Sequence, residues 1–496
     1  MTRAVSLPVL DDASISDSPK EECGVVAIWN HPQAVHLGYL GLFALQHRGQ
    51  EAAGLAASSN GKINSQRGQG LVSDVLTPDR LQLLDNYYNK DESSHPDTPP
   101  HKRGVIGHTR YSTAGGSGLE NIQPLVENMF DGPIAIAHNG NLINANAWKH
   151  ELSKRGQIFH TSSDTEVMVH LLAHPDQRNS HDPTAAMLQN LQGAFSLVIL
   201  YKDRIEAARD PWGFRPLVLG ELPDGSPAIA SETVALDVMG ATIIREIEPG
   251  EIVTLSDEGL TSRRFASPQA PLARCVFEHV YFANPASTVF GQNVLISRER
   301  FGAQLAIESP VDADFVMPMP DSGRSAANGY ANQSGIPYRE GIVPNRYVGR
   351  TFIKPTQEQR AAAVRLKLNV VSEIVKDKRV IIVDDSIVRG TTTREKMKQI
   401  REAGASEIHV RISCPPIISP CFFGVDFATP DQLIAHNKSV EEIRDYLGVD
   451  SLEFLSHEGM LDVMHDQESG YCTACFTGKY PIDPERPLAC QVSAAY

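Results

Sequence analysis

The feature that most constrains the fold is an apolar run that ends in two adjacent acids and a turn rich in glycine and threonine. Residues 380–383 (VIIV) precede Asp384 and Asp385, and residues 386–392 lead into a helix expected over residues 393–403. A strand followed directly by a helix is the repeating unit of a parallel, doubly wound α/β sheet. Ligands bind at the carboxyl ends of such strands, so the sequence predicts a ligand site at this turn.

The residue types in the turn indicate which ligand it binds. Backbone N–H groups at a helix start, with hydroxyl side chains and the positive end of the helix dipole, favour a phosphate. Two neighbouring acids suit ribose hydroxyls and a Mg²⁺ that also binds substrate oxygens. The alternative is an ordinary polar connection, but the order of apolar run, two acids, Ser, Arg-Gly and three threonines makes that the weaker interpretation. The turn does not have a Walker A pattern, which argues against a nucleotide triphosphatase.

This segment resembles the phosphoribosyl pyrophosphate-binding motif of type I phosphoribosyltransferases. The resemblance implies that Asp384 and Asp385 hold Mg²⁺. It assigns the phosphoribosyl pyrophosphate to the turn and the helix start, at Ser386, Arg389, Gly390, Thr391 and Thr392.

Two other segments match the same family. Residues 318–323 (PMPDSG) follow a strand expected over residues 314–319, and the matching family loop holds the pyrophosphate, with Ser322 helping to carry the metal. Residues 345–354 (NRYVGRTFIK) resemble a loop that closes over the pyrophosphate and excludes water. Its expected cations are Arg346, Arg350 and Lys354. By themselves the two segments could be a plain turn and a solvated basic loop.

The first half of the chain opens with a cysteine. Residues 1–22 are polar and acidic without periodicity, whereas Cys23 begins the β-rich run CGVVAIW. A cysteine at a strand start is usually just buried. Four later motifs change that interpretation: QHRGQE at 46–51, HTRYSTAG at 108–115, AHNGN at 137–141 and SDTE at 163–166. The set resembles the class II glutamine amidotransferases, which have an N-terminal-nucleophile αββα sandwich fold.

The resemblance implies that Cys23 is the nucleophile. Removal of residues 1–22 by cleavage after Glu22 would free its α-amine, whose pKa of about 7.7–8.0 allows it to shuttle a proton near neutral pH. Asn139, through its side chain, and Gly140, through its backbone N–H, match the family's oxyanion hole.

Three residues match the family's glutamine pocket. Arg110 would clamp the α-carboxylate, Asp164 would hold the α-ammonium, and the backbone at Gly49 would line the pocket. Each of these residues has a plain alternative, for instance a surface charge at 110 or a helix N-cap at 164. An interpretation in which every one of these residues has its plain role is less economical than a single glutamine site.

A class II glutaminase followed by a type I phosphoribosyltransferase resembles the amidophosphoribosyltransferase family, from Cys23 to residue 480. That family transfers ammonia from glutamine to phosphoribosyl pyrophosphate, giving 5-phosphoribosylamine, glutamate and pyrophosphate in the first committed step of purine synthesis. The resemblance also implies inhibitory purine nucleotides and a homotetramer. Two alternatives are another class II amidotransferase, such as a sugar aminator, and a nucleotide-sensing homologue without turnover. The two-acid motif argues against the first, and the complete glutaminase set argues against the second.

Four of the seven cysteines match the ligands of the family's 4Fe-4S subgroup: Cys275, Cys421, Cys472 and Cys475. Four thiolates suit an iron–sulfur cluster. Zinc, which four thiolates also bind, and buried cysteines without a metal are the alternatives. A leader before the catalytic cysteine accompanies the cluster in that subgroup. Cys414 and Cys490 match no ligand position and are expected to be structural.

Composition limits the remaining partners. The formal net charge of −15 argues against nucleic acid. No apolar run is long enough for a membrane span, and the acidic N-terminus does not resemble a signal peptide. We therefore expect a cytoplasmic protein with reduced thiols.

The expected domains follow from these motifs. They are a propeptide (1–22), a glutaminase domain (23–255), a linker (256–272), a phosphoribosyltransferase domain (273–440) and a C-terminal segment with cluster ligands (441–496). Two polar inserts, 86–103 and 174–184, are expected to be surface loops.

Overall fold

The computed structural model describes residues 23–89, 103–111, 118–345, 368–425, 429–464 and 470–484. These residues form two compact units. The larger unit contains the described residues from Cys23 to Ser297, with residues 420–425, Met464 and residues 470–484. The smaller unit contains the described residues from Arg298 to Ser419 and from 429 to Val463.

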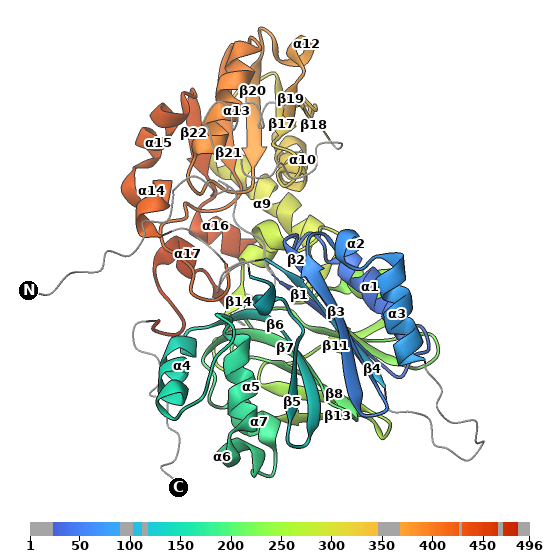
Figure 1. Ribbon diagram of the computed structural model, residues 1–496. Helices are drawn as coiled ribbons and strands as arrows, with labels where there is room; N and C mark the ends of the chain where they lie inside the picture. The colour runs from blue at the N-terminus through green and yellow to red at the C-terminus, as the bar shows by residue number, and fades with distance from the viewer. Residues whose placement is uncertain are drawn as a thin grey trace, which may run out of the picture. The chain divides into compact units, whose positions relative to one another are not determined.

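The larger unit is built on two antiparallel sheets (Figure 1). The seven-stranded sheet has the order β11-β9-β10-β1-β4-β2-β3, and the six-stranded sheet has the order β13-β12-β8-β7-β6-β5. The strands of the first are β1 (Gly24–Trp29), β2 (Ala52–Ser59), β3 (Lys62–Gln69), β4 (Gly104–Arg110), β9 (Val218–Glu221), β10 (Pro227–Ala230) and β11 (Thr242–Glu246). Those of the second are β5 (Leu125–Met129), β6 (Gly132–Leu142), β7 (Gly193–Leu200), β8 (Arg204–Arg209), β12 (Glu251–Ser256) and β13 (Gly259–Arg264).

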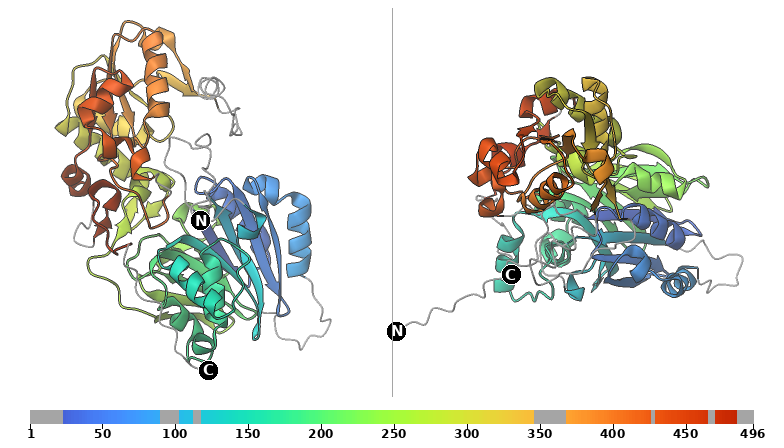
Figure 2. Two further views of the ribbon diagram at one scale, coloured as in Figure 1. Left: turned by 60° about the vertical axis from the view of Figure 1, so that its left-hand side comes forward. Right: turned by 90° about the horizontal axis from the view of Figure 1, so that it is seen from above.

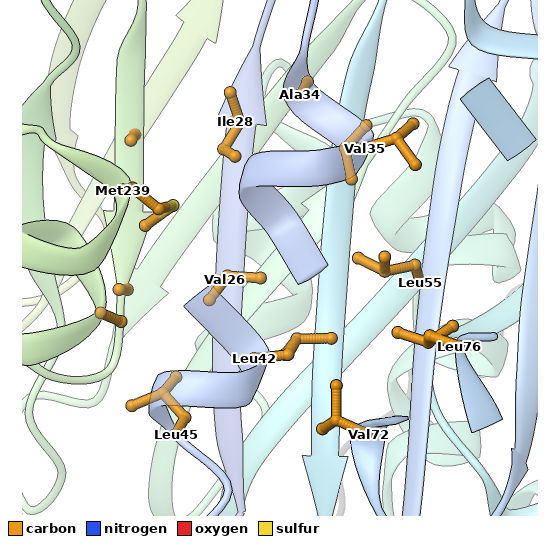
Figure 3. Packing of buried hydrophobic residues seen from close by; sticks show 14 of the residues in the cluster. Val26, Ile28, Ala34, Val35, Leu42, Leu45, Leu55, Val72, Leu76 and Met239 are labelled. Atoms are coloured by element: carbon orange, nitrogen blue, oxygen red, sulfur yellow. The ribbon is translucent and has the colours of Figure 1, made fainter. Parts of the chain in front are cut away.

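Strand β1 shows why the sheets stack face to face. Successive side chains of a strand point to opposite faces. Val26 and Ile28 therefore pack with Leu42 of helix α1 (Figure 3), whereas Val25 and Ala27 pack in the core between the sheets. A sheet buried on both faces needs helices outside it. The helices over the first sheet include α1 (Ala34–Ala44), α2 (Val72–Val75), α3 (Pro78–Tyr88) and α8 (Thr233–Met239).

The second sheet is covered in the same way, which completes the αββα sandwich expected from the sequence. Trp148, Leu171 and Met187 pack against Phe195 and Leu197 of β7. The covering helices are α4 (Ala145–Lys154), α5 (Thr165–Ala173), α6 (Pro175–Arg178) and α7 (Pro183–Leu188). Shorter elements of this unit are η1 (Leu119–Asn121), β14 (Arg274–Cys275), the π-helix η2 (Glu278–Phe282), β15 (Thr288–Val289), β16 (Gln292–Asn293), β23 (Tyr471–Cys472) and α17 (Ala474–Thr477).

The smaller unit contains the parallel sheet predicted from the alternation of strands and helices. Its order is β17-β20-β21-β22, formed by β17 (Phe315–Pro318), β20 (Arg379–Asp384), β21 (Glu407–Ile412) and β22 (Ser451–Phe454). Helices α10, α13 and α15 lie beside it in two views (Figures 1 and 2). The other elements are α9 (Val294–Glu308, shared with the larger unit), α10 (Arg324–Ser334), β18 (Ile342–Pro344), β19 (Leu368–Val370), α12 (Ser372–Val375), α13 (Thr391–Glu402), η3 (Pro430–Gln432), α14 (Ile434–Asn437), α15 (Val440–Leu447) and α16 (His457–Asp462).

Three sequence-based expectations about connections are wrong. The linker expected over residues 256–272 contains β13, whose six residues pair with β12. The insert expected over residues 174–184 contains α6 and the start of α7, and the insert expected from residue 86 begins inside α3. The sequence analysis missed these elements because their residues are largely polar: β13 lies at a sheet edge, and the helices expose one face to solvent.

The domain boundaries also shift. Residues 273–297 belong to the larger unit, and β22 extends the parallel sheet beyond residue 440. Among the described residues, no helix is long and apolar enough to cross a membrane.

Candidate active sites

Cys23 lies immediately before β1, and its side chain is buried. The thiol Sγ lies 3.8 Å from the carbonyl oxygen of Tyr111, and the Cys23 carbonyl accepts a 3.0 Å hydrogen bond from Arg48 Nε. Burial raises the pKa of the Cys23 thiol, although the Tyr111 contact and the charge of Arg110 oppose the shift. The thiol therefore needs a base to take its proton before it can attack.

Asn139 and Gly140 lie on β6, in the half that extends past its neighbour β5. The Asn139 side chain is 1% exposed, and its Nδ2 has no hydrogen-bond partner within the described ranges. A buried amide donor without a partner is costly and marks a place where a ligand acceptor fits.

The backbone N–H of Gly140 points away from β7, toward the side of β6 that β5 does not cover, as the alternation of N–H directions along the strand shows. His138 N donates to Gln123 Oε1 (2.7 Å) and Leu142 N donates to Asp164 Oδ2 (2.9 Å), so alternate N–H groups face away from β7. Gly140 lies between them at φ +146°, where an added Cβ would meet the carbonyl oxygen of Ala194 at 2.1 Å. Only glycine fits, and its N–H faces the edge that an oxyanion would approach.

Asp164 accepts a hydrogen bond from Leu142 N of β6, and its carboxylate also carries a negative charge. It is buried, and burial alone would raise its pKa, but His138, 3.6 Å away, and the Leu142 N–H outweigh that effect and hold the pKa below its usual value. It is therefore ionised at neutral pH, as binding of an ammonium group requires.

The remaining glutamine-pocket residues belong to the other sheet, at the end of its interior strand β4 and in the segment before β2. Arg110 ends β4 opposite Ala52, and its charge acts on the Cys23 thiol. An added Cβ at Gly49 would lie 2.7 Å from the backbone of Arg110, so the two backbones are in close contact. Gln46 Nε2 donates to the Gly49 carbonyl. The charges of Arg110 and Asp164 both act on the Cys23 thiol, so these three predicted residues lie near one another.

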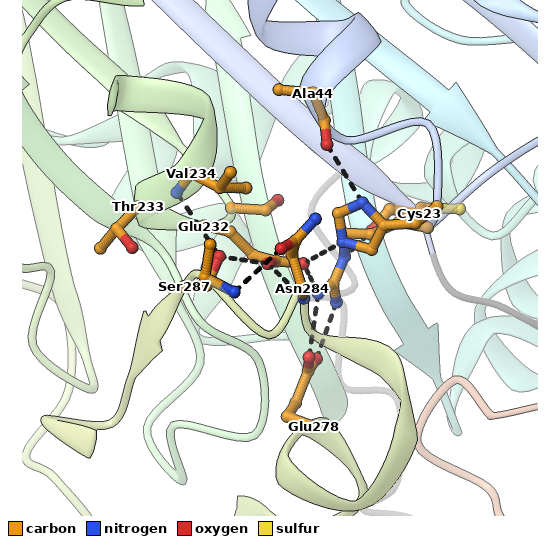
Figure 4. Close-up of polar contacts among 12 residues, drawn as sticks. Cys23, Ala44, Glu232, Thr233, Val234, Glu278, Asn284 and Ser287 are labelled. Carbon is orange, nitrogen blue, oxygen red and sulfur yellow. Dashed lines mark hydrogen bonds and ion pairs between the residues drawn. The ribbon is translucent and has the colours of Figure 1, made fainter. Parts of the chain in front are cut away.

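Beneath Cys23 lies a buried ion network that the sequence analysis did not identify (Figure 4). Arg48 pairs with Glu232 and with Glu278, both at 2.7 Å, and all three side chains are fully buried. His47 adds a 2.7 Å contact to Glu232, and Arg215 lies 3.5 Å from Glu278. The available signal was charge within apolar sequence, such as Glu278 in CVFEHVYF.

The larger unit also gathers the four predicted cluster cysteines. Cys275 and Cys472 face each other in the parallel pair β14–β23, and Cys475 lies on the following helix α17. Cys421 Sγ accepts a 3.3 Å hydrogen bond from Phe423 N and acts electrostatically on Cys275 and Cys472. Burial raises the pKa of Cys275 to about 11, while the positive charge of Arg215 opposes the shift.

The chemistry of this set is that of a cluster of soft thiol groups beside a cation. Four thiols, two of them less than 10% exposed, come from three separate segments. Burial raises the pKa of the Cys275 and Cys472 thiols, and binding of a metal would deprotonate its thiol ligands. Among the described residues there is no group of three or more His, Cys, Asp or Glu placed to hold a single metal ion.

In the smaller unit, the predicted turn lies at the carboxyl end of β20. Asp384, Asp385 and Ser386 are buried, Asp385 N donates to Asp384 Oδ1 (3.0 Å), and the Ser386 hydroxyl donates to Asp385. Burial, and then the charge of Asp385, raise the pKa of Asp384 well above its usual range. Such a pair gains from a cation or from hydroxyl donors that neutralise it.

The turn then leads into α13 through Gly390, whose φ is +76°. Thr391 and Thr392 form the first turn of α13, and the first N–H groups of a helix have no partner within it. Arg389 donates to Gln432 at 2.5 Å. The turn thus has the geometry expected of an anion site.

The loop after β17 reaches the same edge. Pro318 pairs in register with Val383, and an added Cβ at Gly323 would lie 2.3 Å from the Val383 carbonyl and 3.2 Å from Asp384 Cα. Ser322 therefore lies in a loop packed against the acid pair. Cys414 is buried, and burial together with the charges of Asp385 and Asp384 raises the pKa of its thiol. The predicted cations Arg346, Arg350 and Lys354, the propeptide and Cys490 lie outside the described residues.

Comparisons with known proteins agree with this geometry. A family model described as a glutamine amidotransferase domain matches residues 108–238. The amidophosphoribosyltransferase of Bacillus subtilis is 47% identical, over 93% of this chain and 94% of that protein, and the chloroplastic one of Glycine max is 46% identical, over 94% and 79%. A solved B. subtilis glutamine phosphoribosylpyrophosphate amidotransferase, complexed with ADP and GMP, superposes with a TM-score of 0.83 at 45% identity, covering 93% of this chain and 98% of that one.

Fold and sites together define a class II glutamine amidotransferase whose second unit is a type I phosphoribosyltransferase. The relatives match it over nearly the whole length of both chains. The chain belongs to the amidophosphoribosyltransferase family.

Proposed function

We propose that this protein hydrolyses glutamine at Cys23 and transfers the ammonia to phosphoribosyl pyrophosphate, giving 5-phosphoribosylamine, glutamate and pyrophosphate for de novo purine synthesis. The observation that carries the proposal is the occurrence, in one chain, of two sets of buried groups. One unit holds the buried Cys23 and the Asn139 amide, whose Nδ2 has no hydrogen-bond partner among the described residues, and the other holds a buried acid pair at the end of β20, just before helix α13. Each feature serves one half of the reaction.

The first half is acyl transfer. The Cys23 sulfur forms a bond to the amide carbon of glutamine, and Asn139 Nδ2 and Gly140 N–H stabilise the developing oxyanion. The carbon–nitrogen bond breaks, ammonia leaves with the proton taken from the thiol, and water hydrolyses the thioester to glutamate. Arg110 and Asp164 orient the substrate through its carboxylate and ammonium groups.

The second half is substitution at the ribose. The ammonia nitrogen bonds to the anomeric carbon, and the carbon–oxygen bond to pyrophosphate breaks with both electrons leaving on oxygen. Asp384 and Asp385 hold the ribose side, and the Gly390–Thr392 turn holds the phosphate. A Mg²⁺ held by the acids and Ser322 would neutralise charge on the leaving pyrophosphate when bound.

The test is a stoichiometry. Protein incubated with Mg²⁺, glutamine and phosphoribosyl pyrophosphate is expected to form glutamate and pyrophosphate in equal amounts. Omission of glutamine without added ammonia should abolish pyrophosphate release. Glutamine-dependent transfer to another sugar phosphate in place of phosphoribosyl pyrophosphate would overturn the assignment, and so would nucleotide binding without turnover.

The nucleophile is proposed to act as an N-terminal residue. The support is chemical, because the buried thiol needs a base and a free α-amine on Cys23 supplies one. Cleavage after Glu22 is therefore expected, and the mass of the active protein should begin at Cys23. Full glutamine-dependent activity in protein that retains Met1 would contradict this proposal.

Cys275, Cys421, Cys472 and Cys475 are proposed to hold a 4Fe-4S cluster, as in the iron–sulfur subgroup. The donor set and the opposing charge of Arg215 support it. Neither half-reaction transfers electrons, so the cluster would be structural or oxygen-sensing. Anaerobically purified protein should be brown and contain iron and inorganic sulfide, whereas zinc alone would overturn the assignment.

Regulation and assembly follow the family. The B. subtilis relative was solved with ADP and GMP, and we propose that purine nucleotides inhibit this protein by occupying its phosphoribosyl site. We further propose a homotetramer in the cytoplasm. Inhibition that phosphoribosyl pyrophosphate relieves competitively, and a tetramer mass in solution, would support these proposals.

A further inference from the structure

Residues 421–424, which include Cys421, pack against β6, the strand that carries Asn139 and Gly140. Asn141 Nδ2, on β6, donates a 2.8 Å hydrogen bond to the carbonyl oxygen of Phe422. An added Cβ at Gly424, which has φ +111°, would lie 3.3 Å from both Cα and the carbonyl carbon of Gly140. The backbone at Gly424 therefore lies close to Gly140, the residue whose N–H faces the proposed oxyanion position.

Arg215 joins the same segment to the buried ion network. Its side chain is 1% exposed, one terminal nitrogen donates to the Phe423 carbonyl (2.7 Å), and the other lies 3.5 Å from Glu278. Phe423 is two residues from Cys421, so a displacement of Cys421 would move the carbonyl that accepts the Arg215 hydrogen bond.

The network continues to the nucleophile. Glu278 receives two hydrogen bonds from Arg48, at 2.7 and 2.9 Å, and Arg48 Nε donates to the backbone carbonyl of Cys23. One route from the four-cysteine site therefore ends at Gly140 and the other ends at Cys23. These are the two groups whose relative position decides how well the tetrahedral intermediate is held.

We infer that residues 421–424 and Arg215 transmit the state of the four-cysteine site to the glutaminase centre, with Asn141 and Arg215 acting as positioning residues for Gly140 and Cys23. The inference rests on the proposed function, because it assumes that glutamine is hydrolysed at Cys23. It predicts that disturbance of the cysteine site lowers glutamine use before it affects transfer of free ammonia.

The first test removes the contacts one at a time. Asn141→Ala deletes one hydrogen bond from a partly exposed side chain. Gly424→Ala strains a residue at φ +111° and inserts a methyl group 2.9 Å from Arg215 Nη2 and 3.3 Å from the Gly140 backbone. Both should lower kcat for glutamine hydrolysis, by about 3- to 10-fold for Asn141→Ala, with little change in glutamine KM, because the oxyanion contact forms in the transition state. Ammonia-dependent pyrophosphate release should not change.

The control is Asn89→Ala, which also removes an asparagine Nδ2 bond to a backbone carbonyl, that of Pro32, at 3.1 Å. It also removes bonds to Asp85 and Arg103, so it perturbs at least as many contacts as Asn141→Ala. It should leave the ratio of glutamine- to ammonia-dependent rates unchanged. A loss of folded protein would lower both rates together, and the thermal unfolding midpoint reports it directly. An unchanged ratio in both Asn141→Ala and Gly424→Ala would overturn the inference.

The second test is a double-mutant cycle between Cys421→Ser and Asn141→Ala. The readouts are the iron content and the rate at which the diazoketone analogue of glutamine alkylates Cys23. If the cysteine site acts through this segment, the two substitutions together should slow labelling by less than the product of their separate effects. Independent, multiplicative effects would contradict transmission.

The two levels of failure are distinguishable. Wild-type protein that releases no pyrophosphate with either nitrogen donor would refute the proposed function itself. Wild-type protein that is active with both donors, with multiplicative effects in the cycle, would refute the coupling alone.

Discussion

The two active sites are built in opposite ways. The acid pair and phosphate turn of the smaller unit come from one continuous stretch, Asp384 to Thr392, at the end of a parallel strand. The glutaminase centre of the larger unit draws Cys23, Gly49, Arg110 and Asn139 from separate segments of an antiparallel sandwich. The first site therefore depends on a local motif, and the second depends on long-range packing.

The difference predicts how each site fails. A local site loses its chemistry when its own side chains change, while the surrounding fold remains. A site assembled from distant segments is also lost when a buried residue that never touches substrate is changed. The following four predictions test that contrast, from the largest expected effect to the smallest.

Asp385→Asn should abolish most transfer with both nitrogen donors, by at least about 10³-fold. The substitution removes one of the two carboxylates that serve the ribose and Mg²⁺. Because the effect is local, alkylation of Cys23 by the diazoketone analogue of glutamine should proceed at the wild-type rate. Slower alkylation would mean that the two sites are not structurally independent.

Asn139→Ala should lower glutamine-dependent turnover by about 10²- to 10³-fold, since one oxyanion donor is lost. The Nδ2 donor has no partner among the described residues, so its loss breaks no internal hydrogen bond of its own. Steady-state kinetics with glutamine and with ammonia measure the effect. Equal losses with both donors would assign Asn139 to the fold instead of the oxyanion hole.

Glu232→Gln should lower the free energy of unfolding of the larger unit by about 3 kcal/mol at pH 7, because it leaves Arg48 with one fewer buried partner. Burial alone would raise the pKa of Glu232, but His47 and Arg48 together hold it well below 4.5.

Because the folded pKa of Glu232 is lowered, its contribution to stability depends on pH. The unfolded carboxyl binds a proton below pH 4.5 while the folded one does not, so this stabilisation is present above pH 4.5 and declines as the pH falls below it. The difference between the thermal unfolding midpoints of wild type and variant should therefore shrink steadily as the pH falls below 4.5, toward the much lower folded pKa. A constant difference would contradict the ion-pair account.

Ser439→Ala should have the smallest effect. Ser439 and Glu442 form a capping box at the start of α15 in the smaller unit. Loss of the cap should cost about 1 kcal/mol in the stability of that unit, with both half-reactions intact. Denaturant titration of wild type and variant gives the difference, and altered kinetics would contradict a purely structural role.

The contrast also explains what the sequence could and could not predict. The strand, the acids and the turn at 380–392 were predicted closely because local order specifies them: β20 is Arg379–Asp384 and α13 begins at Thr391. The separate glutaminase residues were found through a family resemblance, and the structure brings Arg110 and Asp164 within electrostatic reach of Cys23.

Contacts over long sequence separations could not be predicted. Arg48 and Glu278 are 230 residues apart, and Asn141 and Phe422 are 281 apart, so no periodicity or spacing connects them. Strand β13 was missed for a related reason, because its polar residues at a sheet edge look like a linker. The predicted cations at 346–354 and the propeptide stay predictions, since they lie outside the described residues.

The most direct test of the two-site account is the nitrogen-donor specificity of Cys23→Ala. The variant lacks the nucleophile and keeps every described residue of the phosphoribosyl site. The account predicts that pyrophosphate release falls by at least about 10³-fold with glutamine and stays near the wild-type rate with ammonia. Retained glutamine-dependent release, or loss of the ammonia-dependent reaction in correctly folded protein, would contradict it.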